Sequence, residues 1–320
     1  MTEDTQPTRS KRLEGMLWAS FAGDALALGV HWIYDPSKIR EISGELDSYT
    51  NPKEGALLYH SGKQAGDFTH YGDQALALLR AVREAGEWSP QAFVEQWVEL
   101  FSGEDTPYMD KATKETVRNR ESGVPLEEIG SLSREMEGAA RFAPLYVALS
   151  DRGAEERIEA VKAQARLRHR GAGSAECAGF LCETADAILE GATVREALER
   201  TVRDGPPDLN TERMLLRAEK VLDRSAPEAV AELGPACGLP GALESSMRIL
   251  LEHGADVEGA LIANTMAGGD SASRGLVIGA LSGAAAGVDG VPARWRDHLR
   301  VKDEIGEAVE AWMSGSEGAA

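Results

Sequence analysis

Apolar residues recur at intervals of three and four positions through most of this 320-residue chain, for example at Leu76, Leu79 and Val82. This period lines one face of an α-helix, whereas a half-buried strand needs strict alternation, which few stretches show. The chain is therefore predicted to be all-α. The predicted helices span residues 75–82, 93–100, 155–167, 175–189, 194–203, 209–222, 243–251 and 257–265.

Four glycines near the C-terminal end, Gly275, Gly279, Gly283 and Gly287, follow one another at every fourth position. They lie in the most apolar segment, residues 275–288, which is too short to span a bilayer. On a helix this spacing forms a ridge of glycines along one face, against which a neighbouring backbone can pack closely. A buried helix with a tightly packed partner is therefore predicted.

Proline and glycine punctuate the chain without a long linker or a low-complexity run, which predicts one compact domain over residues 13–314. Residues 1–12 are polar and charged and carry no apolar signal region. They are predicted to form a flexible tail without a secretory signal. Residues 315–320 are expected to form a second flexible tail.

The formal net charge is −19, from 53 acidic and 34 basic residues. Such a field repels nucleic acid and anionic membranes, so neither is an expected partner. The three cysteines fit no paired zinc pattern and no disulfide framework. A reducing compartment, and with it a cytoplasmic location, is predicted.

One acidic residue stands inside an otherwise apolar helical stretch. Residues 16–34 read MLWASFAGDALALGVHWIY, with Asp24 in the middle and a His-Trp-x-Tyr cluster at the end. A charged aspartate there costs free energy unless it is paired, hydrogen-bonded or bound to a cation. Asp24 is therefore either a site residue or a buried helix cap, and both interpretations remain open.

A second polar segment, residues 66–74, reads GDFTHYGDQ and leads directly into an apolar helix. Asp73 falls in the first turn of that helix, where exposed amides and the positive end of the helix dipole favour a carboxylate. Capping alone explains Asp73 equally well. The density of polar side chains, including His70 and Tyr71, favours a functional site.

A third polar segment, residues 267–275, reads AGGDSASRG and opens the helix that carries the glycine ridge. It places Asp270 and the hydroxyls of Ser271 and Ser273 at a helix N-terminus. Free amides and oxygen ligands together suit an anion or a hard cation. Two such segments, each opening a helix, indicate a binding site more strongly than either one alone.

Five segments, in order, resemble the signature of the ADP-ribosylglycohydrolase superfamily and most closely its crystallin J1-like branch. They read GDALALGVHW, FTHYGDQ, GAARFAPL, LRHRGAGSAECAGFL and AGGDSASRGLVIGALSGAAAG. The resemblance runs from about Leu13 to Val288. It implies a compact orthogonal bundle of helices with a central cleft. In active members it also implies a pair of Mg²⁺ or Mn²⁺ ions that bind ADP-ribose and assist hydrolysis of the ribosyl C1 bond.

The metal-binding runs of that family are altered in this chain. The Thr-Asp-Asp run aligns with residues 71–73, where only Asp73 keeps a carboxylate. The Asp-x-Asp-Thr run aligns with residues 270–273, where Asp270 is kept, the second carboxylate is lost and Ser273 replaces threonine. Two divalent cations need several oxygen ligands. The resemblance therefore implies at most one weakly held Mg²⁺, bound by Asp73, Asp270 and Ser273.

The resulting prediction is a hydrolase of an ADP-ribosyl or related ribosyl glycosidic bond, acting on a small-molecule substrate. The catalytic candidates are Asp24, His31, Asp35 and Asp73. The substrate-binding candidates are His70, Tyr71, Arg141, His169, Ser271 and Arg274. His31 stands at the position of a family glutamate, and His31 and Arg274 are candidates for fixed positive charge in place of a metal.

Two alternatives remain beside this prediction. The first is a non-catalytic binding or structural relative, like a crystallin, which the loss of metal-binding carboxylates favours. The second is a hydrolase of a different small glycoside or amide in the same cleft. The concentration of histidine, aspartate and arginine in the polar segments favours an enzyme over a purely structural protein.

Overall fold

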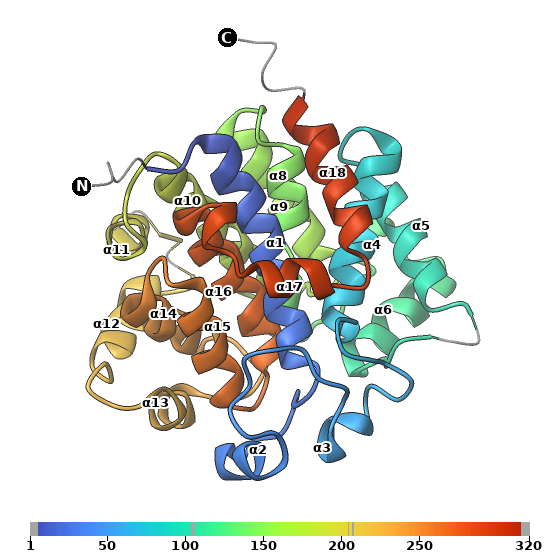
Figure 1. Ribbon diagram of the computed structural model, residues 1–320. Helices are drawn as coiled ribbons and strands as arrows, with labels where there is room; N and C mark the ends of the chain where they lie inside the picture. The colour runs from blue at the N-terminus through green and yellow to red at the C-terminus, as the bar shows by residue number, and fades with distance from the viewer. Residues whose placement is uncertain (1–5, 104–105, 204, 207, 315–320) are drawn as a thin grey trace.

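The computed structural model describes residues 6–103, 106–203, 205–206 and 208–314. Within these ranges the chain is helical and has no strand, only isolated bridges at Ser131–His169 and Glu135–Gly238. The all-α prediction is confirmed (Figure 1). In these same ranges no helix is long and apolar enough to cross a membrane.

The helices of the first half are α1 (Arg9–Ala27), α2 (Pro36–Ser43), α3 (Glu54–Leu57), α4 (His70–Ala85), α5 (Pro90–Leu100), α6 (Lys111–Glu121), η1 (Leu126–Glu128), α7 (Glu137–Ala140), α8 (Ala143–Ala148) and α9 (Ala154–Arg166). Those of the second half are α10 (Ser174–Leu189), α11 (Val194–Arg203), α12 (Thr211–Glu219), α13 (Ala226–Leu233), α14 (Gly241–His253), α15 (Val257–Met266), α16 (Ser271–Ala286), η2 (Val288–Gly290), α17 (Ala293–His298) and α18 (Lys302–Ser314). The helices predicted from periodicity all occur near their expected positions. Helix α4 begins at His70 instead of residue 75 because the hydroxyl of Thr69 caps its N-terminus.

The first helix begins earlier than the sequence suggested. Helix α1 starts at Arg9, inside the range 1–12 that was predicted as a tail. The Arg12 guanidinium is buried and donates hydrogen bonds to the carbonyls of Ala284 and Ala285 at 3.2 and 3.3 Å. The predicted domain start at residue 13 is therefore too late. Residues 1–5 and the predicted tail 315–320 lie outside the described residues.

Helices α1 and α16 form the centre of the molecule and lie side by side in antiparallel orientation (Figure 1). A Cβ added at Gly279 would overlap the backbone carbonyl of Ala19, and one added at Gly275 would lie 2.5 Å from the carbonyl oxygen of Gly23. Real Cβ atoms do not approach backbone atoms this closely. The predicted glycine ridge is confirmed, and it holds the two backbones in direct contact.

Two sets of hydrogen bonds bring the ends of three helices together. The Asp24 carboxylate in α1 accepts bonds from the Thr69 amide (2.8 Å), the Thr69 hydroxyl (2.6 Å) and the Gly72 amide (3.0 Å), which ties α1 to the start of α4. In the turn after α1, the Trp32 amide donates to the carbonyl of Gly269 at 3.0 Å. This bond ties that turn to the loop before α16.

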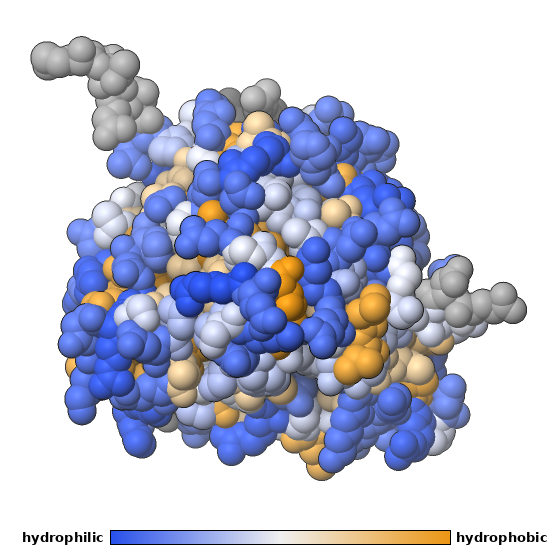
Figure 2. Space-filling model, turned by 60° about the horizontal axis from the view of Figure 1, so that its bottom comes forward, coloured by the Kyte–Doolittle hydropathy of each residue, from blue (hydrophilic) through white to orange (hydrophobic). Residues whose placement is uncertain are grey.

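Hydrophilic residues dominate the face of the molecule shown in Figure 2, and its hydrophobic residues form small separate patches. The large exposed hydrophobic side chains are Tyr34, Leu57, Leu58, Leu132 and Leu216. Leu58 also lines the cavity described below.

Candidate functional site

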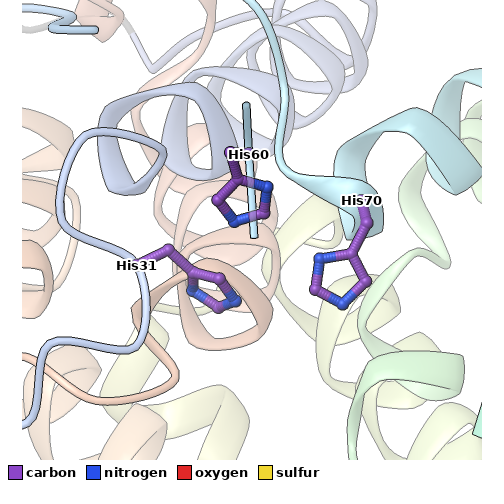
Figure 3. A group of neighbouring side chains, drawn as sticks. All are labelled: His31, His60 and His70. Atoms are coloured by element: carbon purple, nitrogen blue, oxygen red, sulfur yellow. The ribbon is translucent and has the colours of Figure 1, made fainter. Parts of the chain in front are cut away.

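Three histidines converge where the turn after α1, the loop after α3 and the start of α4 meet (Figure 3). His31, His60 and His70 are all buried. Their ring centroids lie 5.4 to 5.8 Å apart, and one potential ligand atom from each lies within 4.8 Å of the others. In the described part of the chain this is the one group of three His, Cys, Asp or Glu side chains that could hold a metal ion.

Most ring nitrogens of this group lack a hydrogen bond. Both nitrogens of His31, both of His70 and Nε2 of His60 are buried without a hydrogen-bond partner. Burial, reinforced by the neighbouring imidazoles, lowers the pKa of His31 well below its usual value and that of His60 to about 2. Both rings are therefore neutral near pH 7 and present a lone pair, which is the form that binds a metal.

Aromatic side chains surround the histidines. Trp32 stacks on His31 with a centroid distance of 4.7 Å and meets Tyr59 edge-on at 4.7 Å. Tyr59 in turn meets Tyr108 at 5.1 Å. Trp32 has φ of 64°, a left-handed conformation that a non-glycine residue adopts only when its surroundings enforce it. The bond of its amide to the loop before α16 supplies that constraint.

A cavity of about 600 Å³ opens in front of α4. Its wall is formed by residues 58–63 of the loop after α3, by His70, and by residues 106–108. The volume falls within the range of small-molecule binding sites. Two of the three histidines, His60 and His70, thus border the cavity.

The aspartates of the three polar segments all have protein partners. Asp73 accepts two bonds from the Lys63 ammonium, both at 2.7 Å, and Lys63 also lines the cavity. Burial raises the pKa of Asp73, and Lys63 opposes that shift. Burial likewise raises the pKa of Asp24 to about 7, against the bonds from Thr69. The contacts of Asp24 are those of a buried cap, since its carboxylate accepts bonds from Thr69 and Gly72 at the start of α4.

Asp270 lies next to the histidine cluster. Its Oδ1 accepts a bond from Trp32 Nε1 at 3.2 Å and stands 3.7 Å from His31 Nε2, while its Oδ2 accepts a bond from the Ser273 hydroxyl. Burial raises the pKa of Asp270, and Ser273 and Arg274 oppose the shift. The structure therefore places Asp270 between His31 and Ser273.

Arg274 and Ser271 are fully buried and face protein atoms. The Arg274 guanidinium donates to Asn264 Oδ1 at 2.9 Å and to the carbonyl of Pro235 at 3.2 Å. The carbonyl of Ser271 accepts a bond from the side chain of Asn264 at 2.7 Å. Both residues hold the loop before α16 in place, so direct substrate contact by either needs a rearrangement.

Arg141 and His169 belong to a buried ionic network centred on Glu137. The carboxylate of Glu137 pairs with Arg141, lies 3.1 Å from Arg168 Nε and contacts His169 Nε2 at 3.0 Å. Burial alone would raise the pKa of Glu137, but Arg141 and Arg168 lower it to about 2. Arg168 also donates two bonds to Asp110, at 2.7 and 2.8 Å. The side chains of Arg141 and His169 are therefore buried and bound within this network.

Glu135 is a partly exposed carboxyl at the edge of the same region, with 27% of its side chain accessible. Burial and the charges of Asp110 and Asp270 raise its pKa to about 7. Asp110 stands 3.6 Å from His70 Nε2, so Glu135 is electrostatically coupled to groups on both sides of the histidine cluster. It combines accessibility with a pKa near neutrality, as a general base requires.

Two predicted site residues, Tyr71 and Asp35, lie in different surroundings. Tyr71 is buried against His70, with ring centroids 4.0 Å apart. Asp35 is exposed at the N-cap of α2, where it accepts bonds from the amide and hydroxyl of Ser37. Six further residues contribute to the arrangement and were not predicted from the sequence: Tyr59, His60, Lys63, Asp110, Glu135 and Glu137. Asp110 caps α6, Glu137 opens α7 and the others lie outside the helices, so only the three-dimensional structure reveals their contacts.

Comparison with known proteins yields consistent matches over nearly the whole chain. The sequence profile of the family described as ADP-ribosylglycohydrolase matches residues 5–319. An uncharacterized protein of Archaeoglobus fulgidus is 26% identical over 300 residues, which cover 89% of this chain and 90% of that protein. Crystallin J1A of Tripedalia cystophora is 22% identical over 323 residues, covering 97% and 98%. A solved structure described as an ADP-ribosylglycohydrolase-related protein complex matches with a TM-score of 0.68 at 20% identity, covering 95% and 97%, and supports the fold.

Proposed function

The chain belongs to the ADP-ribosylglycohydrolase family, and we propose that it hydrolyses the glycosidic bond of an ADP-ribosyl or related ribosyl compound. The observation that carries the proposal is the cavity of about 600 Å³ in front of α4. It combines aromatic rings, an ammonium group and the imidazoles of His60 and His70. Glu135 lies outside the cavity wall, and burial together with the charges of the nearby Asp110 and Asp270 raises its pKa.

The cavity wall suits an ADP-ribosyl group. Tyr59 and Tyr108 offer aromatic faces on which an adenine ring can stack, a contact worth about 1–3 kcal/mol per base. The Lys63 ammonium lines the same cavity and can pair with a diphosphate. Lys63 is held in place by Asp73, so Asp73 acts as a positioning residue in this proposal.

The residues present do not fit a pair of Mg²⁺ ions. Mg²⁺ prefers oxygen ligands in near-octahedral geometry, but Asp73 is paired with Lys63 and Asp24 with Thr69 and Gly72. The groups that converge in the described residues are imidazoles instead of carboxylates. In our proposal the hydrolysis therefore proceeds without the Mg²⁺ pair, and the Mg²⁺ site expected at Asp73, Asp270 and Ser273 is not part of it.

Glu135 is the proposed general base. Its carboxylate accepts a proton from a water molecule while the water oxygen bonds to ribose C1 and the glycosidic bond breaks. The proton then passes to the leaving group, which restores the carboxylate. A carboxyl pKa of about 7 is matched to this exchange at neutral pH.

The test is a hydrolysis assay on ADP-ribosyl-arginine, ADP-ribosyl-serine and O-acetyl-ADP-ribose, with released ADP-ribose measured by chromatography. At least one substrate should be turned over. Lys63→Ala should raise KM about tenfold or more because it removes the diphosphate partner. Lys11→Ala is the matched control, since Lys11 forms an equally short but exposed pair with Asp289 at 2.6 Å. Equal KM values for the two variants would contradict the role of Lys63.

The pH dependence tests Glu135 separately. A base must be ionised, so kcat/KM of the wild-type enzyme should rise with pH through about 7 and level off above it. Glu135→Gln should lower kcat by about 100-fold or more and remove this rise. A variant with normal kcat, or one that keeps the same pH profile, would exclude Glu135 as the base.

A non-catalytic binding protein is the second candidate. The pairing of Asp73 and Asp24 with protein groups favours it, because these carboxylates are not free to act on a ligand. In that case the chain would bind ADP-ribose with Lys63-dependent affinity and release no product from any of the three substrates.

A further inference from the structure

We infer that His31, His60 and His70 form a binding site for one divalent transition-metal ion, with Zn²⁺ as the reference ion. The rings lack hydrogen bonds at most of their nitrogens. Five buried ring nitrogens have no hydrogen-bond partner, and an unsatisfied buried polar group costs about 1–3 kcal/mol. A metal ion coordinated by one nitrogen of each ring would turn three of these unfavourable groups into bonds.

The type of donor selects the type of metal. Neutral imidazole nitrogen suits Zn²⁺, Cu²⁺, Ni²⁺ and Fe²⁺, whereas Mg²⁺ and Ca²⁺ require oxygen. Three histidines at the edge of a cavity are also the ligand set of catalytic zinc sites, in which water takes the fourth position. His60 and His70 line the cavity, so the open coordination position would face it.

Carboxylates stand beside the rings and favour a cation there. Asp270 Oδ1 lies 3.7 Å from His31 Nε2, and Asp110 Oδ2 lies 3.6 Å from His70 Nε2. In metal sites the ligating histidines commonly lie next to such carboxylates, which orient the rings and raise their basicity. Arg168 also pairs with Asp110 and Ser273 with Asp270, so both carboxylates are held in position beside the rings.

Metal binding needs only a small movement of the rings. Zn–N bonds of about 2.0–2.1 Å in tetrahedral geometry place the nitrogens roughly 3.3 Å apart, and the atoms now lie within 4.8 Å of one another. His31 is fixed by the locked turn that contains Trp32, and His70 by the N-terminus of α4. His60 lies in the loop after α3, outside any helix.

The test is isothermal titration of tag-free protein, stripped with a chelator, with ZnCl₂ and separately with MgCl₂. One Zn²⁺ should bind per chain with a Kd of about 1 μM or lower, and Mg²⁺ should give no heat at millimolar concentration. Co²⁺ bound in the same site should show the visible absorption of tetrahedral coordination. These readouts need no substrate, so they succeed or fail independently of the proposed hydrolase.

Variants distinguish this site from adventitious binding. His60→Gln should weaken Zn²⁺ binding about 100-fold or more, and His31→Gln should do the same. His298→Gln is the control, because His298 lies outside the cluster on α17 and bonds to the carbonyl of Arg294. Circular dichroism establishes that each variant is folded. Absence of Zn²⁺ binding to the wild-type protein, or equal Kd values in folded His60→Gln and His298→Gln, would overturn the inference.

Discussion

Gly279→Ala is expected to lower the free energy of unfolding by about 3 kcal/mol, or to prevent folding altogether. The added methyl group would overlap the backbone carbonyl of Ala19 in α1. Because the obstacle is backbone, no change of side-chain rotamer relieves it, and α1 and α16 must separate. Urea unfolding followed by circular dichroism measures the loss.

Gly306→Ala is the matched control for this variant. Gly306 also lies in a helix, α18, but nothing stands within 4 Å of the position that a Cβ would take. Alanine there should leave stability unchanged or raise it by about 0.5–1 kcal/mol, because alanine restricts the unfolded chain. Equal losses in the two variants would show that the contact between α1 and α16 is not the cause.

Glu137→Gln is expected to lower the free energy of unfolding by a similar amount, about 3 kcal/mol. The substitution keeps the shape of the side chain but removes the negative charge that faces Arg141 and Arg168, all of them buried. The effect should depend on pH. Since the pKa of Glu137 is lowered from 4.5 to about 2, the native carboxylate stabilises the fold above about pH 4.5 and loses this contribution as pH falls toward 2.

Glu307→Gln serves as the control for this charge. Glu307 forms a 3.1 Å pair with Arg83 on the surface, where solvent screens the interaction. Loss of this surface pair should change the free energy of unfolding little at any pH. A Glu137→Gln variant as stable as Glu307→Gln, or a difference between them that persists at pH 2, would contradict the role assigned to the buried network.

Much of the fold could be predicted from the sequence because helices have a local signature. The periodicity of apolar residues placed the helices, and the spacing of Gly275 and Gly279 indicated a close helix partner without identifying it. The partner, α1, follows only from the tertiary structure. The start of α1 at Arg9 was missed because its first turn is polar, and the bonds of Arg12 to the end of α16 are long-range contacts.

The site could be predicted only in part, for a related physical reason. His31, His70 and Asp270 lie at helix ends whose polar runs stand out against apolar helices, and the structure brings them together. His60 and Glu135 lie in irregular segments, where nothing in the local sequence indicates their role. Conversely, Asp35 and Arg141 were predicted from the sequence as site residues. In the structure Asp35 caps α2 and Arg141 pairs with Glu137.

A crystal structure of the protein with ADP-ribose will show whether the cavity in front of α4 takes an ADP-ribosyl group. We expect the adenine ring against Tyr59 and Tyr108, the diphosphate at Lys63, and ribose C1 on the side of Glu135. ADP-ribose bound elsewhere on the molecule, or an empty cavity at saturating ADP-ribose, would contradict the proposed binding mode.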